Sequence, residues 1–194
     1  MDSGNIGFVL LCAAFVFVMT PGLAMFYGGL VRKKNVVNTM MTSIFIIGIG
    51  IVMWVLFGYS LSFAPSGNAF IGDFRWLGLE GVSLTEGYTD GASIPNMVFS
   101  AFQMMFAVIT PALITGAVAG RMKFKSIFVF TIFWSLIVYY PLAHMVWGQG
   151  GLLGADGIGA LDFAGGDVVH ISSGVSALVL CILLGKRHDY EHSI

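Results

Sequence analysis

The chain has 194 residues, of which 57 % are hydrophobic and 10 % are charged, and its formal net charge is −1. Soluble domains carry about 25 % charged residues, so this chain lacks the polar side chains needed to cover a water-facing surface. The balanced charge also provides no basic surface for nucleic acid. The composition therefore predicts an all-α, polytopic bundle of membrane helices that uses the lipid bilayer as its solvent.

Five apolar stretches are long enough to cross a bilayer, because about 20 helical residues span its hydrocarbon core. In chain order they cover residues 6–31, 36–63, 94–119, 126–147 and 163–185. We interpret the first as a retained helix, since no basic segment of a signal peptide precedes it. Prolines are expected to bend the first, third and fourth stretches, at Pro21, Pro111 and Pro141.

Basic residues are distributed unevenly between the two sides of the predicted bundle. Eight follow the first, third and fifth stretches, namely Arg32, Lys33, Lys34, Arg121, Lys123, Lys125, Lys186 and Arg187. The opposite side holds only Arg75. Because cytoplasmic loops carry an excess of lysine and arginine, this pattern predicts an external N-terminus and a cytoplasmic C-terminus in the plasma membrane.

Neither a metal centre nor an enzyme site is predicted. Cys12 and Cys181 lie within apolar stretches, as small packed side chains do, and no Cys/His cluster has zinc spacing. Asp167, His170 and a serine at 172 or 173 lie close in sequence, as in a serine hydrolase. However, helical residues two apart occupy different faces, and the Gly-x-Ser-x-Gly turn is missing. We therefore expect no cofactor and no catalysis.

The fifth stretch carries the most informative ionisable side chain. His170 lies about 10–12 Å below the outer end of that helix, at a rise of 1.5 Å per residue. Ionisable residues at such depth are expected to face the bundle interior and to mark a pathway. A buried histidine bonded to a backbone carbonyl is the alternative.

Two carboxylates stand near the start of the same stretch. Asp162 suits a helix N-cap, and the alternative is a buried anion that stabilises a cation above it. Asp167 is three residues before His170 and either shares its face or points to the outer surface.

Aromatic residues near the outer ends of the third and fourth stretches are candidates for a cation site. Phe102 and Phe106 share one helix face, and Gln103 lies beside them. With Trp147 they would form an aromatic box that binds a small cation through its ring faces, although packing is the simpler explanation. His144 is interpreted as a residue that hydrogen-bonds within its helix and is a weaker candidate.

Four motifs together resemble the ammonium transporter (Amt/Mep/Rh) family, in family order along the chain. They are MTPGLAMFYGGLVRKKN at 19–35, AFQMMFAVITPALITGA at 101–117, AHMVWG at 143–148 and ALDFAGGDVVHISSG at 160–174. The resemblance implies transport of ammonium or ammonia by a homotrimer. Ammonium would be recruited outside, lose its proton near a gate and pass pore histidines as ammonia.

The resemblance also implies roles for individual residues. Phe102 and Trp147 resemble the walls of the external ammonium site, and Phe106 resembles the outer phenylalanine of the gate. Asp162 resembles the buried acid beneath the site, and His170 the first of two pore histidines.

Two departures from the family pattern stand out. Gly120 occupies the place of a glutamate at the inner end of the third stretch, so an acidic contact is expected to be missing. The family builds its pore from two inverted five-helix repeats, and this chain shows one. We therefore expect a truncated sequence that does not conduct alone. An ammonium-binding sensor module is the alternative.

Overall fold

Five long helices make up the computed structural model, which describes residues 1–65, 68–155 and 157–187. The described residues contain no β-strand. The spans are α1 (Ser3–Gly29); η1 (Lys33–Asn35), α2 (Val36–Met53), η2 (Trp54–Gly58) and α3 (Tyr59–Phe63) in one continuous helix; α4 (Asn96–Val118); α5 (Phe124–Trp134), η4 (Ser135–Tyr139) and α6 (Tyr140–Trp147) in another; and η5 (Gly166–Ile171) with α7 (Ser172–Leu184). A short 3₁₀ turn, η3 (Leu77–Leu79), lies between the second and third spans.

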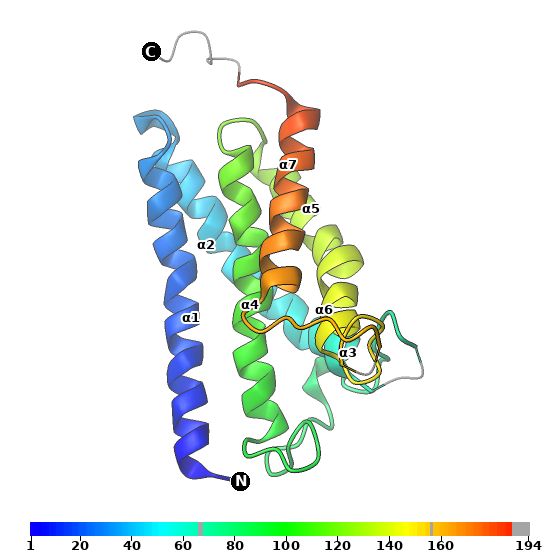
Figure 1. Cartoon of the computed structure of the whole chain (residues 1–194). Coiled ribbons are helices and arrows are strands. Elements are labelled where there is room, and N and C mark those ends of the chain that lie inside the picture. Colours follow the sequence, from blue (N-terminus) through cyan, green and yellow to red (C-terminus); the bar gives the residue numbers. More distant parts are fainter. Residues whose placement is uncertain (66–67, 156, 188–194) are drawn as a thin grey trace.

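All five helices are long and apolar enough to cross a membrane, which confirms the predicted fold class. The predicted helix boundaries lie within three residues of those in the structure. The N-terminus and the end of α7 lie at opposite ends of the bundle (Figure 1). The last span starts at mid-height beside α4, because a long loop after α6 leads into it (Figure 1).

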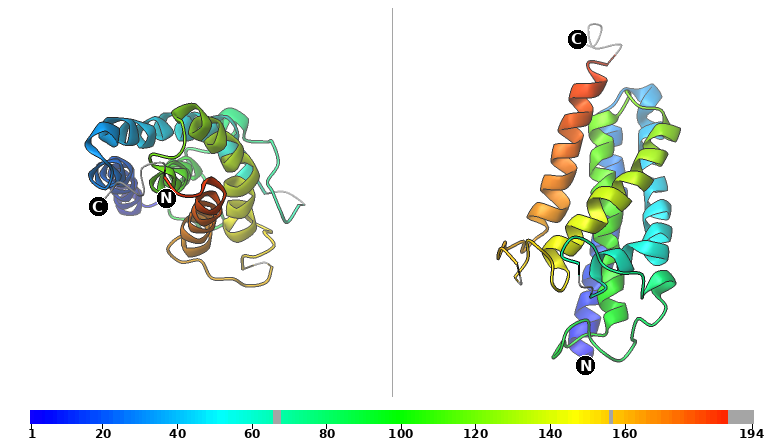
Figure 2. Two further views of the ribbon diagram at one scale, coloured as in Figure 1. Left: turned by 90° about the horizontal axis from the view of Figure 1, so that it is seen from above. Right: turned by 90° about the vertical axis from the view of Figure 1, so that its right-hand side faces the viewer.

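The third span, α4, is the central helix of the bundle. It packs against α1, α2 and α7, and these helices stand around it in the view along the bundle (Figure 2). Half of the apolar window of α4 is buried, against 11 % for α1 and 22 % for the last span. Since α1 and α7 bury so little, most of their apolar surface remains available to lipid or to further protein.

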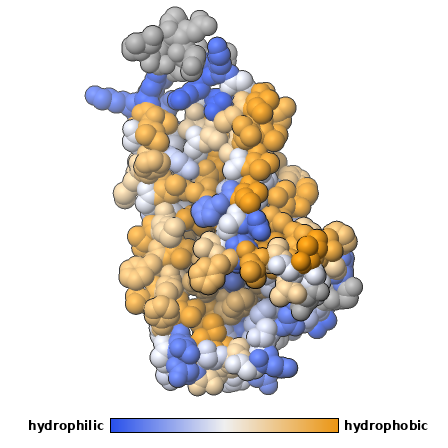
Figure 3. Space-filling view, viewed as in Figure 1, coloured by the Kyte–Doolittle hydropathy of each residue, from blue (hydrophilic) through white to orange (hydrophobic). Residues whose placement is uncertain are grey.

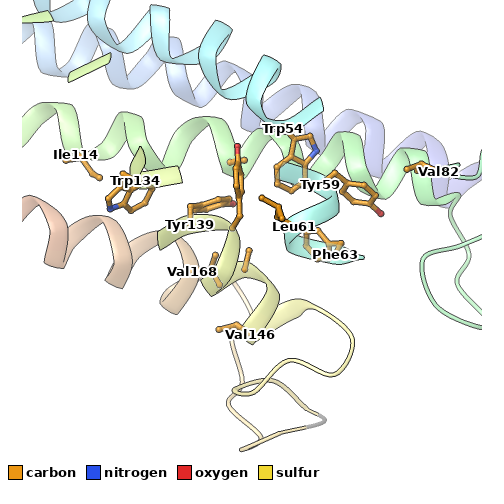
Figure 4. Packing of buried hydrophobic residues seen from close by; sticks show 13 residues of the cluster. Trp54, Tyr59, Leu61, Phe63, Val82, Ile114, Trp134, Tyr139, Val146 and Val168 are labelled. Carbon is orange, nitrogen blue, oxygen red and sulfur yellow. The ribbon is translucent and has the colours of Figure 1, made fainter. Parts of the chain in front are cut away.

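An aromatic cluster joins the second and fourth spans to α4 in the half of the bundle that contains the N-terminus. Trp54, Tyr59 and Phe63 lie side by side (Figure 4), and the rings of Trp54 and Tyr140 are 6.0 Å apart. The indole nitrogen of Trp54 donates to Ser100 Oγ of α4 at 3.3 Å. Large buried rings of this kind dominate packing energy, so the cluster is a rigid support for the loops beside it.

Three of the spans contain a π-helical segment that the sequence did not predict. One of them, η4, ends two residues before Pro141, which cannot donate to the carbonyl four residues earlier. The widened turn accommodates that missing donor within a continuous helix. The segment η2 places Gly58 against the ring of Tyr140, where an added Cβ would lie 2.7 Å from ring carbons. The third segment, η5, opens the last span.

The basic end of the bundle, defined by the eight lysines and arginines named above, contains the departure at Gly120. Gly120 has a φ of +72°, a left-handed conformation that favours glycine over glutamate. Arg121 follows and donates to the carbonyls of Gly185 and Ala117, which ties the end of α4 to the end of α7. Backbone carbonyl oxygens, in place of a glutamate side chain, therefore accept the hydrogen bonds of this arginine. Figure 3 shows hydrophilic side chains gathered at this end.

Two glycines on α2 provide a matched test of the packing against α4. A Cβ at Gly50 would lie 2.9 Å from Val108 Cγ2 and 3.1 Å from Val108 Cα, whereas one at Gly48 meets nothing within 4 Å. Gly50→Val is expected to destabilise the bundle by about 1–3 kcal/mol through overpacking. Gly48→Val carries the same change in helix propensity and should cost less. Equal thermal midpoints for the two variants in detergent would contradict this packing.

Candidate functional site

Five of the eight candidate residues line one cavity of about 650 Å³, here called the aromatic pocket. It lies where α4, the end of α6 and the loop before η5 meet. The lining residues are Tyr88, Thr89, Phe99, Phe102, Gln103, Phe106, Trp147, Asp162, Phe163, Ala164 and Gly165. The aromatic candidates, far apart in sequence, are therefore brought together.

The α4 wall of the pocket consists of two rings and an amide. Phe102 and Phe106 contact each other edge to face, with ring centroids 5.0 Å apart and an interplanar angle of 82°. Gln103 Oε1 is buried and accepts no hydrogen bond from the part of the chain that the structure describes. An unpaired buried acceptor costs about 1–3 kcal/mol, and this oxygen is shielded from the open space of the pocket.

The Asp162 side chain caps the start of the last span through hydrogen bonds. Its carboxylate accepts from the backbone N–H groups of Gly166 at 2.7 Å and of Asp167 and Val168 at 3.0 Å. Gly165, with a φ of +80°, makes the turn into η5. The predicted start at 163 is therefore three residues early, because Asp162 caps the helix from four residues upstream. The carboxylate still lines the pocket, so capping and cation stabilisation are compatible.

His170 lies elsewhere than expected. It is exposed and does not line the aromatic pocket, and its ring makes no hydrogen bond to the described residues. These five helices do not enclose it, since the last span stands at the edge of the bundle with little of its surface covered, and its place in the pore of a complete protein stays a prediction. Asp167 is half-buried and is also outside the pocket. Figure 3 shows a hydrophilic patch over the lower part of α7 in an otherwise hydrophobic middle.

His144 is buried and holds two parts of the chain together. It is fully buried, with Nδ1 3.2 Å from the carbonyl oxygen of Ser62 and Nε2 3.0 Å from that of Asn68. The ring thus joins α6 to the end of α3 and the chain beyond it. His144 is not among the lining residues of the aromatic pocket.

The serines near His170 are oriented away from hydrolase chemistry. Ser172 Oγ donates to the carbonyl of Val168, and Ser173 Oγ donates to that of Val169 at 2.6 Å. A serine nucleophile must instead donate to its histidine base. Both hydroxyl groups therefore satisfy helix carbonyls of the preceding turn.

Six further residues of the pocket were not predicted from the sequence: Tyr88, Thr89, Phe99, Phe163, Ala164 and Gly165. Phe99 lies one turn before Phe102 on α4, so helical spacing was the available signal. Tyr88 and Thr89 belong to the irregular connection between the second and third spans, where no periodicity points to a partner.

The fold and the pocket together define a multi-pass membrane protein with one pocket lined mainly by aromatic residues and a carboxylate. Comparison with known proteins narrows this class. The model of the Ammonium Transporter Family matches residues 7–193. The chain belongs to the ammonium transporter family, as the four motifs indicated.

Named relatives and solved structures agree with this assignment. An ammonium transporter of Bacillus subtilis is 54 % identical over 97 % of this chain and 46 % of its own length. Ammonium transporter 1 of Dictyostelium discoideum is 44 % identical over 98 % of this chain and 41 % of its own length. The crystal structure of Candida albicans Mep2 superposes with a TM-score of 0.85 at 34 % identity, over 97 % of this chain and 41 % of that one. This chain thus spans less than half the length of each.

Proposed function

We propose that this chain contributes to transmembrane transport of ammonium or ammonia and that the aromatic pocket is the site where ammonium is recruited. The observation that carries the proposal is the meeting of Phe102, Phe106 and Trp147 with the Asp162 carboxylate around one cavity. Ring faces attract a small cation, with tryptophan the strongest, and a carboxylate adds a favourable negative charge. Gln103 also lines the cavity, although its Oε1 is buried and not exposed to the open space.

The same chemistry favours passage as neutral ammonia. A full charge in hydrocarbon is very costly, so ammonium must leave its proton behind or be paired throughout its path. Phe106 borders the pocket deeper along α4 than Phe102 and provides an apolar barrier to the charged form. His170 then provides a donor or acceptor for ammonia at mid-bundle, on the surface that further protein would cover.

Orientation and assembly are finer parts of this proposal. The eight-to-one division of basic residues supports a cytoplasmic basic end and an external aromatic pocket in the plasma membrane. A homotrimer is supported by the family resemblance, and the largely exposed apolar surface of α1 offers area for contacts with protein or lipid.

A sensor that binds ammonium without conducting it is the second candidate. A solved structure named Sensor Amt Protein superposes with a TM-score of 0.81 at 28 % identity, over 95 % of this chain. Fold alone therefore does not separate the two functions. The higher identity to the Bacillus subtilis ammonium transporter favours transport.

A chimera tests the transport proposal. These 194 residues would replace the matching region of the Bacillus subtilis transporter in cells that lack their own. We expect growth at low ammonium, and His170→Ala should change flux or ion selectivity about 2–10-fold, the effect of one lost hydrogen bond.

Single cysteines placed at Lys34 and at Arg75 report orientation in the same cells. Only the cysteine at position 75 should react with a thiol reagent added outside. A correctly inserted chimera without ammonium uptake would refute transport.

A further inference from the structure

One side of the aromatic pocket is formed by a residue outside the four sequence motifs. Tyr88 lines it from the connection between the second and third spans. Its ring stacks on Phe99 of α4, with centroids 4.8 Å apart and an interplanar angle of 5°. Phe63 contacts the same ring edge-on at 5.5 Å. Tyr88 is therefore fixed to the rigid part of the bundle although its backbone is irregular.

Gln149 binds the same tyrosine twice. Its backbone N–H donates to the Tyr88 hydroxyl oxygen at 3.1 Å, and its Nε2 donates to the Tyr88 carbonyl oxygen at 2.9 Å. Gln149 is two residues after Trp147, in a loop with glycines at 148, 150, 151 and 154. Glycines give such a loop backbone freedom, so these two bonds restrict the distance between the Tyr88 and Trp147 walls.

We propose that Tyr88 is a further cation-contacting wall of the aromatic pocket and that Gln149 is the positioning residue that sets the width of its mouth. This inference rests on the proposed ammonium site. The face of a tyrosine ring attracts a small cation. The ring contacts with Phe63 and Phe99 and the hydrogen bonds from Gln149 leave Tyr88 little freedom to move. A mouth held at one width favours a small ammonium ion over bulky alkylammonium ions. Loss of either bond from Gln149 should weaken that preference.

Binding to the 194-residue chain in lipid nanodiscs tests the inference, with methylammonium and tetramethylammonium as probes in saturation-transfer NMR. Tyr88→Leu should raise the Kd for methylammonium about two- to fivefold, the usual worth of one cation–ring contact. Tyr88→Phe and Gln149→Met should shift the Kd ratio of the two probes toward tetramethylammonium at an unchanged thermal midpoint. A merely structural role would lower the midpoint and leave the ratio alone. Phe74→Leu removes an exposed ring from the same connection and is the matched control.

A Trp147→Leu variant separates failure of this inference from failure of the proposed function. If Trp147→Leu weakens binding while Gln149→Met and Tyr88→Phe leave the ratio at the wild-type value, the inference is overturned and the ammonium site stands. If Trp147→Leu also has no effect, the aromatic pocket is not the cation site, and both are overturned.

Discussion

Replacing Asp162 by alanine is expected to lower the free energy of unfolding by about 2–4 kcal/mol and to loosen the start of the last span. Three backbone N–H groups donate to this carboxylate, and hydrogen bonds to charged groups contribute about 1.5–3 kcal/mol each without being additive. Loss of an ordinary N-cap costs about 0.5–2 kcal/mol, so this site exceeds that range. Reversible unfolding in mixed micelles, followed by circular dichroism, measures the change.

Asp167→Ala is the matched control. It removes another aspartate side chain near the start of the last span, one that is half-buried and lies outside the aromatic pocket. It should change stability by no more than about 0.5 kcal/mol. Asp162→Asn keeps one acceptor oxygen and should fall between the two. Equal stabilities for Asp162→Ala and Asp167→Ala would show that the carboxylate is not the cap. Loss of cation binding without loss of stability would assign Asp162 to direct contact with the cation.

The helices could be predicted from the sequence because apolar length alone determines whether a segment can span a bilayer. The spacing of Phe102 and Phe106 likewise placed two rings on one face of α4, where they contact each other. The π-helical segments could not be predicted, since the hydrogen-bond shift that defines them depends on tertiary packing such as that of Gly58 against Tyr140. Asp162 was foreseen as a cap, but its reach across four residues depends on the turn at Gly165.

The parts of the site that sequence did not provide come from irregular chain. Tyr88 and Gln149 are 61 residues apart in segments without periodicity, and only the fold brings them together. The exposure of His170 has a different cause. Depth in the membrane predicted a protein environment for an ionisable side chain, but depth does not say which protein surface supplies that environment. On these five helices alone, His170 remains exposed.

Liposomes that contain only these 194 residues are expected to take up ammonia no faster than empty liposomes. His170 is exposed, and the last span buries only 22 % of its apolar window, so these helices do not enclose a path at mid-height. An inverted second copy would bring another His170 to the open side. Such dual insertion requires nearly equal basic charge on both ends, and here eight lysines and arginines oppose one. A parallel second copy would leave both histidines in the same half of the bilayer.

Ammonia flux after an ammonium pulse, reported by a pH-sensitive dye inside the liposomes, provides the measurement. His170→Ala is the control, because a real path would depend on that ring whereas leakage through lipid would not. Equal rates for the chain, the variant and empty liposomes are the expected result. Flux well above that of empty liposomes and abolished by His170→Ala would overturn it, and would mean that copies of this chain pair across the open face despite the charge asymmetry. Cross-linking of single cysteines on opposite ends of α7 would then identify the inverted pair, because only antiparallel copies bring those two ends together.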